Sequence, residues 1–237
     1  MKTIFFGLLA LLFTCSLNAQ TVDDIIAKHT EAIGGKAKLS QINSVYMESG
    51  IEVMGADAPT KTFIMEGKGY RSETNFNGSE IINVVTDKSA WAVNPFGGMS
   101  SPTALSADMF KLSEDQIYTT DPLVNYAAHG AKAELIGQEK VGTANNYKIK
   151  YTNKDNISIT YFIDASTYLI SQVVRQGESM GQEVTVTTVY SNYKKTDYGN
   201  VVPFNSDIDM GQMTLKMSIS KVEVNKTIDP AIFMMGK

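Results

Sequence analysis

Alternation of apolar and polar side chains over many short segments is the feature that most restricts the fold of this chain. In residues 45–53, the apolar side chains of Val45, Met47, Ile51 and Val53 recur at every second position or at multiples of two. Successive side chains of a strand point to opposite faces, so this pattern predicts a half-buried β-strand. The same reasoning predicts further strands at residues 60–67, 70–76, 80–86, 89–93, 132–141, 146–152, 157–164, 169–176, 182–193, 201–209 and 212–224. Tight turns such as Asn77-Gly78 predict that these strands form an antiparallel meander.

Other segments have helical character. Residues 21–33 place their apolar side chains on one helical face, start with the N-cap residue Thr21 and stop at Gly34-Gly35. Residues 107–118 and 122–128, where the alternation is interrupted, are also predicted to be helical. A sheet of this many strands should curl, and the helices are the only elements that can cover its apolar face. We therefore expect a mainly β (α+β) fold that forms one domain over residues 20–237.

Residues 1–19 have the composition of a cleavable export signal. Lys2 precedes an apolar run at residues 4–12 that is too short to cross a bilayer, and Leu17-Asn18-Ala19 predicts cleavage after Ala19. Lipoprotein processing at Cys15 is disfavoured, because Phe13-Thr14 lacks the small residue required just before the cysteine. We expect an exported protein with no membrane-spanning segment.

Composition excludes several other classes of function. The formal net charge is −4 and no basic cluster stands out, so nucleic acid is not an expected partner. Cys15 is the only cysteine, which leaves the exported chain without disulfides, Cys-based metal sites or a thiol nucleophile. The two histidines, His29 and His129, are far apart in the sequence. We therefore expect neither a metal ion nor a cofactor.

One motif resembles a catalytic sequence. Gly177-Glu178-Ser179-Met180-Gly181 matches the G-x-S-x-G elbow of serine hydrolases, which requires a strand–turn–helix and a later histidine. The β-branched residues 184–189 that follow predict a strand instead, and no histidine follows His129. The motif is therefore interpreted as a hairpin turn, and the protein is not expected to be an enzyme.

The number and the positions of the methionines give an indication of function. All of the 12 methionines except Met1 follow the export signal, and Met47, Met65, Met213 and Met217 lie on the apolar faces of predicted strands. Methionine is flexible and polarizable, so it suits surfaces that accept varied apolar shapes. A curled sheet lined in this way would form a cavity for acyl chains. An ordinary packed core fits the same pattern, and the residues alone leave both interpretations open.

Four segments, in this order, carry a resemblance. A turn at Thr86-Asp87-Lys88-Ser89 leads into a strand that contains Trp91 and ends in Asn94-Pro95. Residues 161–170, the pair of segments Tyr190-Ser191-Asn192-Tyr193 and Val202-Pro203-Phe204, and the ending at residues 224–233 complete the set. Together they resemble the LolA-like periplasmic outer-membrane lipoprotein carrier (sorting) proteins, in the version found in Bacteroidetes. Lys88-Ser89 stands where Gly-Lys is usual in that family, which is a mild departure.

The resemblance implies an unclosed antiparallel half-barrel of about eleven strands, with helices covering its concave apolar face. It implies a monomeric carrier that holds the acyl chains of lipoproteins, or other lipids, for transfer to the outer membrane. An inner-membrane exporter and an outer-membrane receptor would be its partners. We expect the cavity to be lined by Met47, Val53, Phe63, Met65, Val84, Trp91, Val93, Phe110, Leu112, Ile159 and Met217. Arg71 falls on the strand where these carriers place an arginine that holds the lid shut; a solvated strand arginine is the alternative.

Two other functions remain open at this stage. A sensor of the same fold could bind lipid or misfolded protein to regulate an envelope stress response, although such sensors carry a second domain for which this chain has no room. A solid β-module could instead bind another protein and no lipid. A cavity of several hundred Å³ beneath the helices would favour the carrier, whereas a filled interior would favour the module.

Overall fold

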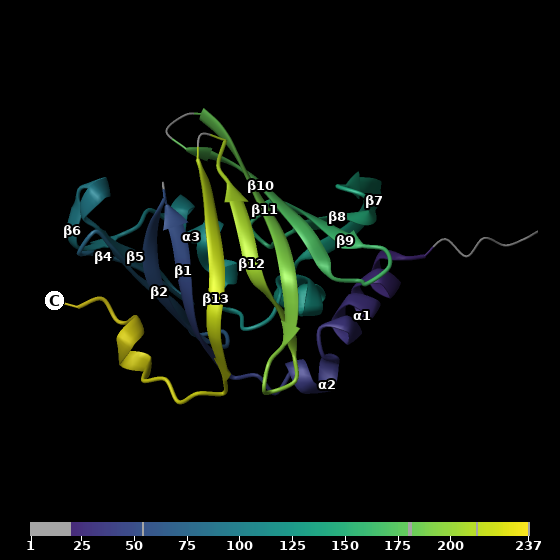
Figure 1. The fold of residues 1–237 in the computed structure, drawn as a ribbon, viewed down its shortest axis with the longest axis horizontal. Helices are drawn as coiled ribbons and strands as arrows, with labels where there is room; N and C mark the ends of the chain where they lie inside the picture. The colour runs from purple at the N-terminus through teal and green to yellow at the C-terminus, as the bar shows by residue number, and fades with distance from the viewer. Residues whose placement is uncertain (1–19, 54, 180–181, 212, 237) are drawn as a thin grey trace, which may run out of the picture.

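The computed structural model describes residues 20–53, 55–179, 182–211 and 213–236 (Figure 1). One antiparallel sheet of 13 strands dominates the described chain, in the order β6-β5-β4-β3-β2-β1-β13-β12-β11-β10-β9-β8-β7. β6 and β7 stand at its two ends and are not paired with each other, so the sheet is not closed into a barrel. The predicted fold class is confirmed, with two strands more than the resemblance implied.

The strands are β1 (Ser44–Val53), β2 (Ala56–Met65), β3 (Gly69–Phe76), β4 (Ser79–Thr86), β5 (Ala90–Asn94), β6 (Met99–Ala104), β7 (Lys132–Val141), β8 (Ala144–Thr152), β9 (Ser158–Asp164), β10 (Ile170–Ser179), β11 (Gln182–Lys195), β12 (Val201–Asp209) and β13 (Thr214–Val224). The helices are α1 (Val22–Ala32), α2 (Lys36–Leu39) and α3 (Ala107–Ser113), and the 3-10 helices are η1 (Pro95–Gly97), η2 (Glu114–Ile117), η3 (Pro122–His129) and η4 (Pro230–Phe233).

Hairpins connect most consecutive strands, and one long-range pairing joins the two halves of the sheet. Asn77 and Gly78 have φ values of 51° and 79°, the left-handed conformation that a two-residue hairpin turn requires. β1 pairs with β13, which brings the first strand of the chain beside the last. In that pairing Ser49 faces Ile219 but Glu48 faces Lys221, so one residue of β13 is bulged. The unpaired residue of this bulge is Ser220.

The helices form a layer against one face of the sheet, which we call the inner face (Figure 1). α1 begins at the N-cap Thr21, whose side chain accepts a hydrogen bond from the backbone N–H of Asp24. The carboxylate of Asp24 in turn accepts a hydrogen bond from the backbone N–H of Thr21. Its buried face, with Ile25 and Ile26, packs with Ile149 and other residues of β8, β9 and β10. The start and the position of this helix agree with the sequence prediction.

The structure differs from the sequence prediction between Asn94 and Gly130. Met99–Ala104 forms the edge strand β6, although its sequence lacks apolar alternation and contains Pro102. An edge strand needs only one paired side and tolerates proline, so the usual sequence signals are weak there. The predicted helix at residues 122–128 is present as the 3-10 helix η3.

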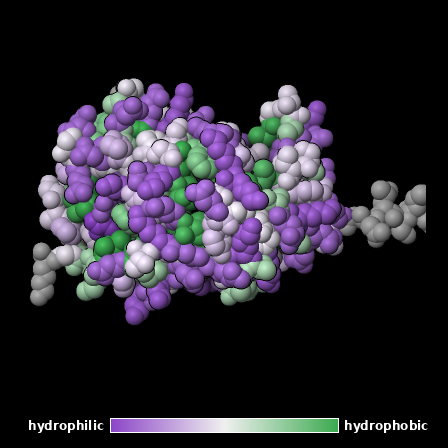
Figure 2. Space-filling model, turned by 60° about the horizontal axis from the view of Figure 1, so that its bottom comes forward, coloured by the Kyte–Doolittle hydropathy of each residue, from purple (hydrophilic) through white to green (hydrophobic). Residues whose placement is uncertain are grey.

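The other face of the sheet, which we call the outer face, is covered over β2–β5 by the C-terminal segment, residues 228–233. Phe233 packs against Val84 and Trp91 in one buried cluster, and the Trp91 indole Nε1 donates a hydrogen bond to the Phe233 carbonyl at 3.1 Å. A Cβ at Gly69 would lie only 2.6 Å from the Phe233 ring, so a glycine makes this close approach possible. On the surface shown in Figure 2, hydrophobic residues form small separate groups among hydrophilic ones.

Residues 1–19, on which the predicted export signal falls, lie outside the described residues. Among the residues that are described, no helix combines the length and the apolar character needed to cross a membrane.

Candidate functional site

Strand register shows which side chains share the inner face. Ile51 pairs with Met217, Met217 with Ser206, and Ser206 with Tyr190. Directly opposed residues of antiparallel strands project from the same face. Tyr190 packs against the core cluster that also contains Ile25 of α1. The chain of pairs therefore places Ile51 and Met217 on the face that the helices cover.

A group of apolar residues on this face is left without a packing partner in the core, and we call it the apolar strip. Its members are partly exposed, and none of them belongs to or packs against the four core clusters found in the described chain. They are Ile51, Val53, Val184, Val186, Ile208, Leu215, Met217 and Ile219. The strip runs across the middle of the sheet, near the ends of β1, β10 and β12, and offers apolar surface to a ligand.

The lid, which we define as α3 and η2, extends across the half-barrel from β4 and β5 on one side to β10 on the other. Phe110 of α3 packs with Val85 and Ala90 of β4 and β5. Leu112, two residues further on, reaches β10, where its Cδ2 lies 4.0 Å from the position of a Cβ on Gly177. The side chains of Met109 and Leu112 are 52% and 46% exposed, which is high for residues of their size and apolarity. The lid therefore presents apolar side chains next to the apolar strip.

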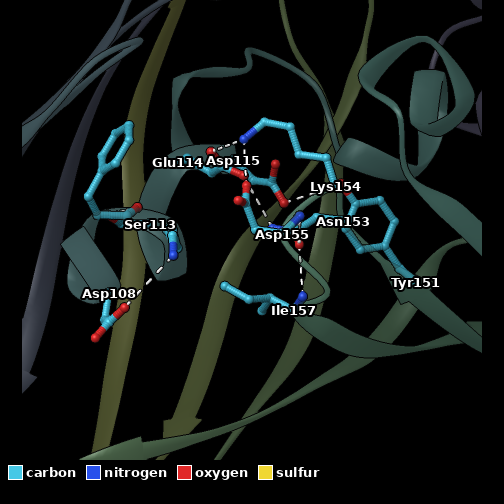
Figure 3. Close-up of polar contacts among 11 residues, drawn as sticks. Asp108, Ser113, Glu114, Asp115, Tyr151, Asn153, Lys154, Asp155 and Ile157 are labelled. Carbon is cyan, nitrogen blue, oxygen red and sulfur yellow. Dashed lines mark hydrogen bonds and ion pairs between the residues drawn. The ribbon is translucent and has the colours of Figure 1, made fainter.

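A polar network ties the lid to the turn between β8 and β9 (Figure 3). The ammonium of Lys154 lies 2.6 Å from Glu114 Oε2 and 2.5 Å from Asp155 Oδ2. Asn153 Nδ2 donates a hydrogen bond to Glu114 Oε1 at 3.3 Å, and the hydroxyl of Tyr151 donates to Asp115 Oδ2 at 3.2 Å. Burial raises the pKa of both Glu114 and Asp115 above the usual range of a carboxyl group.

A second tether joins the lid region to the turn between β2 and β3. Glu66 Oε2 accepts hydrogen bonds from the backbone N–H and the hydroxyl of Thr119, at 2.7 and 2.6 Å. The backbone N–H of Gly67 donates to the carbonyl of Ile117 at 3.0 Å. The lid is therefore held at both sides of the half-barrel by polar contacts, in addition to the packing of Phe110 and Ile117 against β4 and β5.

A pocket of about 210 Å³ lies between α1, α2 and the first residues of β12. Its wall includes the side chains of His29, Asp121, Tyr190 and Tyr193 among apolar residues. Burial raises the pKa of Asp121 and of Tyr190, and the nearby guanidinium of Arg175 opposes both shifts. This pocket therefore combines apolar walls with buried polar groups, in contrast to the apolar strip.

One polar atom of a residue that lines this pocket, and one of a residue next to its wall in the sheet, lack a partner within the described protein. His29 is 1% exposed; its Nδ1 lies 2.7 Å from the carbonyl oxygen of Tyr168, whereas its Nε2 is buried and unpaired. Ser206, opposite Tyr190 in the sheet, has a buried and unpaired hydroxyl. Unpaired buried polar atoms are uncommon, and they point to a binding partner or an ordered water.

Comparison with known proteins identifies the architecture. No protein-family model matches the sequence, and no curated protein is significantly similar to it. Solved structures do match over most of their length. A LolA superfamily protein from Nitrosomonas europaea has a TM-score of 0.60 at 12% identity, covering 90% of this chain and 97% of that one. A putative outer membrane lipoprotein-sorting protein domain from Vibrio parahaemolyticus has a TM-score of 0.58 at 13% identity, covering 88% and 95%.

A DUF1329 family protein from Desulfovibrio piger is similar to the same degree, with a TM-score of 0.59, 15% identity and coverage of 91% and 98%. This chain has the LolA fold. The similarity extends over nearly the whole described chain, so the sequence resemblance is confirmed at the level of the fold.

Within this LolA fold, the eleven residues predicted to line one cavity divide between the two faces. Six lie on the inner face or in the lid that covers it: Met47, Val53, Phe110, Leu112, Ile159 and Met217. Val53 and Met217 belong to the apolar strip and Leu112 to the lid, whereas Met47, Phe110 and Ile159 pack into core clusters. Lipid contact by these six remains a prediction.

The other five residues do not face the interior. They are Phe63, Met65, Val84, Trp91 and Val93, and they pack together on the outer face beneath the C-terminal segment. The structure therefore does not bring all eleven residues to one face of the sheet. The cause is physical: both faces of β4 and β5 are apolar because both are covered, so alternation cannot tell which face encloses the cavity.

Arg71 also lies on the outer face of the LolA fold. Its Nε donates to Glu73 Oε1 at 2.7 Å, and its guanidinium NH1 donates to the carbonyl of Ile232 at 2.9 Å. The guanidinium carbon lies 5.7 Å from the centre of the Trp91 ring. Arg71 therefore holds the C-terminal segment, and the lid latch proposed for it from the resemblance is not seen. The neighbouring tyrosine, Tyr70, is the residue of β3 that packs toward the lid.

Sequence reasoning missed the residues that do hold the lid, chiefly Lys154, Glu114 and Glu66. Lys154 and Glu114 are separated by 40 positions, and charged residues in turns are too common to indicate a pair. The acidic pair Glu114-Asp115, within the helix predicted at residues 107–118, is the one sequence signal that could have suggested a tether. Only the fold brings the turn at Lys154 beside it.

Gly177, Glu178 and Ser179 of the G-x-S-x-G motif form the end of β10, and Met180 and Gly181 lie outside the described residues. β10 ends at Ser179 and pairs antiparallel with β11, which begins at Gln182. A strand follows the motif where a hydrolase elbow requires a helix. In the described residues, no group of three or more His, Cys, Asp or Glu side chains is arranged to hold a metal ion.

Proposed function

We propose that this protein binds the acyl chains of lipoproteins or other lipids inside the half-barrel and carries them across the periplasm to the outer membrane. The apolar strip is the observation that carries the proposal. Its residues are apolar and partly exposed, on the one face of the sheet that a lid covers. Transfer of an acyl chain from water onto such a surface gains about 0.8 kcal/mol for each buried methylene.

Cargo binding in this proposal requires movement of the lid. The pocket between α1, α2 and β12 holds about 210 Å³ and the one lined by lid residues about 230 Å³. Both are smaller than the 300–1,000 Å³ typical of sites for drug-sized ligands. The lid is attached through polar contacts with Lys154 and Glu66, and Leu112 already projects its apolar side chain with high exposure. Lid displacement would expose the apolar strip, and Met109 and Leu112 would then contact the cargo.

Three points support the proposed transfer of cargo across the periplasm. The predicted export signal directs the chain to the periplasm. The fold is shared with a lipoprotein-sorting domain and a LolA superfamily protein. A carrier of this kind takes its cargo from an exporter in the inner membrane and gives it to a receptor in the outer membrane. In this proposal the protein acts as a monomer and needs no cofactor.

The test is lipid binding by two variants at neighbouring positions of β13. Met217 lies in the apolar strip, while Ser218 is exposed on the opposite face and accepts a hydrogen bond from Asn205 Nδ2. We expect Met217→Asp to weaken binding of a fluorescent fatty acid about tenfold or more, because a charge would lie in the apolar site. Ser218→Asp adds the same charge outside the site and should leave the affinity unchanged.

Mass spectrometry of lipids that co-purify from the native periplasm would identify the cargo. A protein that carries no lipid and does not bind the fatty acid would contradict the proposal and favour the protein-binding module. Equal losses of affinity in both variants would also contradict it, because binding would then not depend on the apolar strip.

A further inference from the structure

We propose that the pocket lined by His29, Asp121 and Tyr190 binds a hydroxyl-bearing part of the ligand, so that the preferred cargo is a lipid with free hydroxyl groups. The inference rests on the proposed lipid binding and adds the chemistry of a second subsite. We call this pocket the hydroxyl subsite. It lies between α1, α2 and the start of β12. Its wall residue Tyr190 is in the same cross-strand row as Met217 of the apolar strip.

The first observation is the position of the unpaired acceptor on His29. The imidazole is almost fully buried, and its Nδ1 lies 2.7 Å from the carbonyl of Tyr168. A carbonyl can only accept, so Nδ1 must carry a proton, and in a neutral imidazole Nε2 is then an acceptor. Since Nε2 has no partner within the described chain and His29 lines the pocket, a donor group in the pocket would complete its hydrogen bonding.

The second observation is the mixture of donors and acceptors around the same space. Asp121 Oδ1 accepts a hydrogen bond from the backbone N–H of Leu123 at 2.8 Å, which leaves acceptor capacity on the carboxyl group. Tyr190 brings a hydroxyl that can donate or accept. Apolar side chains such as Ile33 and Leu39 form much of the remaining wall. A ligand group that fits must therefore be small, partly apolar and able both to donate and to accept.

An alcohol has this combination, and ionic groups do not. An anion such as a phosphate would meet the Asp121 carboxyl in a site of low polarity, which is costly. A cation would compete with Arg175, which already interacts with Asp121 and Tyr190. A hydroxyl reproduces both hydrogen-bonding roles of a water molecule, so it can occupy the subsite without leaving an acceptor unpaired.

The test compares two lipids with the same acyl chain, 1-monooleoylglycerol and methyl oleate. Each displaces the fluorescent fatty acid from the wild-type protein, and the ratio of their affinities measures the contribution of the free hydroxyls. We expect the wild type to favour monooleoylglycerol by roughly three- to tenfold, the range that one or two net hydrogen bonds supply.

Two substitutions should remove that preference. Asp121→Asn keeps the size and the N-capping ability of the side chain but replaces an acceptor by a donor, and Tyr190→Phe removes one hydroxyl. Tyr193→Phe is the matched control, because the Tyr193 hydroxyl already donates to the carbonyl of Ile170 at 2.7 Å. We expect the affinity ratio to fall toward one in both test variants and to be retained in the control.

The results distinguish failure of the hydroxyl subsite from failure of the proposed lipid binding. Equal binding of the two lipids by the wild type, or a preference that survives both test substitutions, would overturn the hydroxyl subsite and leave the proposed lipid binding intact. Loss of the preference in Tyr193→Phe to the same extent would also overturn it. If neither lipid binds to the wild type, the proposed function and this inference both fail. Thermal unfolding of each variant shows whether the fold is retained.

Discussion

The guanidinium of Arg71 donates a hydrogen bond to the backbone carbonyl of Ile232, 161 residues away in the sequence, at 2.9 Å. This contact fixes the C-terminal segment on the outer face of β3, and Glu73 holds the guanidinium in place from the same strand. A strand that packs toward the lid through Tyr70 can therefore also carry an arginine whose contacts lie on the opposite face of the sheet.

Replacement of Arg71 by alanine should release the C-terminal segment and leave the lid in place. We expect a loss of about 1–2 kcal/mol in the free energy of unfolding, since a charged hydrogen bond is removed. Hydrogen exchange should accelerate at residues 228–233 and stay unchanged in α3. Faster exchange in α3, together with altered fatty-acid binding, would instead support the latch role inferred from the family resemblance.

Gly69→Ala should displace the ring of Phe233. The added Cβ would lie 2.6 Å from that ring, and the strand backbone on one side of it cannot move freely. We expect a destabilisation of about 1–3 kcal/mol and a shift in the fluorescence of Trp91, whose indole is hydrogen-bonded to Phe233. Gly50→Ala on β1 is the control, because nothing lies within 4 Å of its added Cβ. Equal effects of the two substitutions would contradict the close approach.

Lys154→Met should loosen the lid with little effect on overall stability. The Lys154 side chain is 59% exposed, so its ion pairs contribute below about 1 kcal/mol. In the proposed mechanism the lid opens when this tether breaks. We therefore expect faster hydrogen exchange in α3 and η2 and faster uptake of the fluorescent fatty acid. Lys148→Met removes a comparable ion pair, 2.8 Å from Glu139, at the edge of the sheet. Similar uptake rates in the two variants would argue against a tether at Lys154.

Asp121→Asn should stabilise the protein more at pH 7 than at pH 4. Burial raises the pKa of Asp121 in the folded protein, so folding favours the protonated carboxyl. That contribution is fully present below the unfolded pKa and is lost as the pH rises through the folded value. Asparagine cannot ionise and avoids the loss. Melting temperatures at both pH values measure the difference, with Asp57→Asn, at an exposed position of β2, as the control for removal of a charge. A larger gain at pH 4 would contradict the direction of this pKa shift.

Much of the fold is readable from local sequence patterns because those patterns have local causes. Alternation in β1, the turn at Asn77-Gly78 and the N-cap at Thr21 each follow from backbone geometry within a few residues. β6 escaped prediction, because an exposed edge strand needs neither alternation nor apolar side chains. β6 is a strand because it pairs with β5, and its own sequence pattern does not indicate this.

The faces of the strands were harder to assign than the strands themselves. In β4, Val84 is buried beneath Phe233 while Val85 is buried beneath Ile117, so two adjacent valines serve opposite sides. Nothing within β4 distinguishes them. The difference between the two valines depends on the distant C-terminal segment, whose apolar residues Ile232 and Phe233 pack on the face that carries Val84. For the same reason the lid tether at Lys154 could not be found without the fold.

The two ends of the sheet, β6 and β7, carry a mechanical consequence. In a closed barrel, any increase in diameter must break or shift ladder hydrogen bonds. Here the gap between β6 and β7 can widen or narrow by a small change of twist at each of the strand pairs between them, with every ladder retained. The width of the interior can therefore adapt to cargoes of different bulk, with the lid tethers setting the limit.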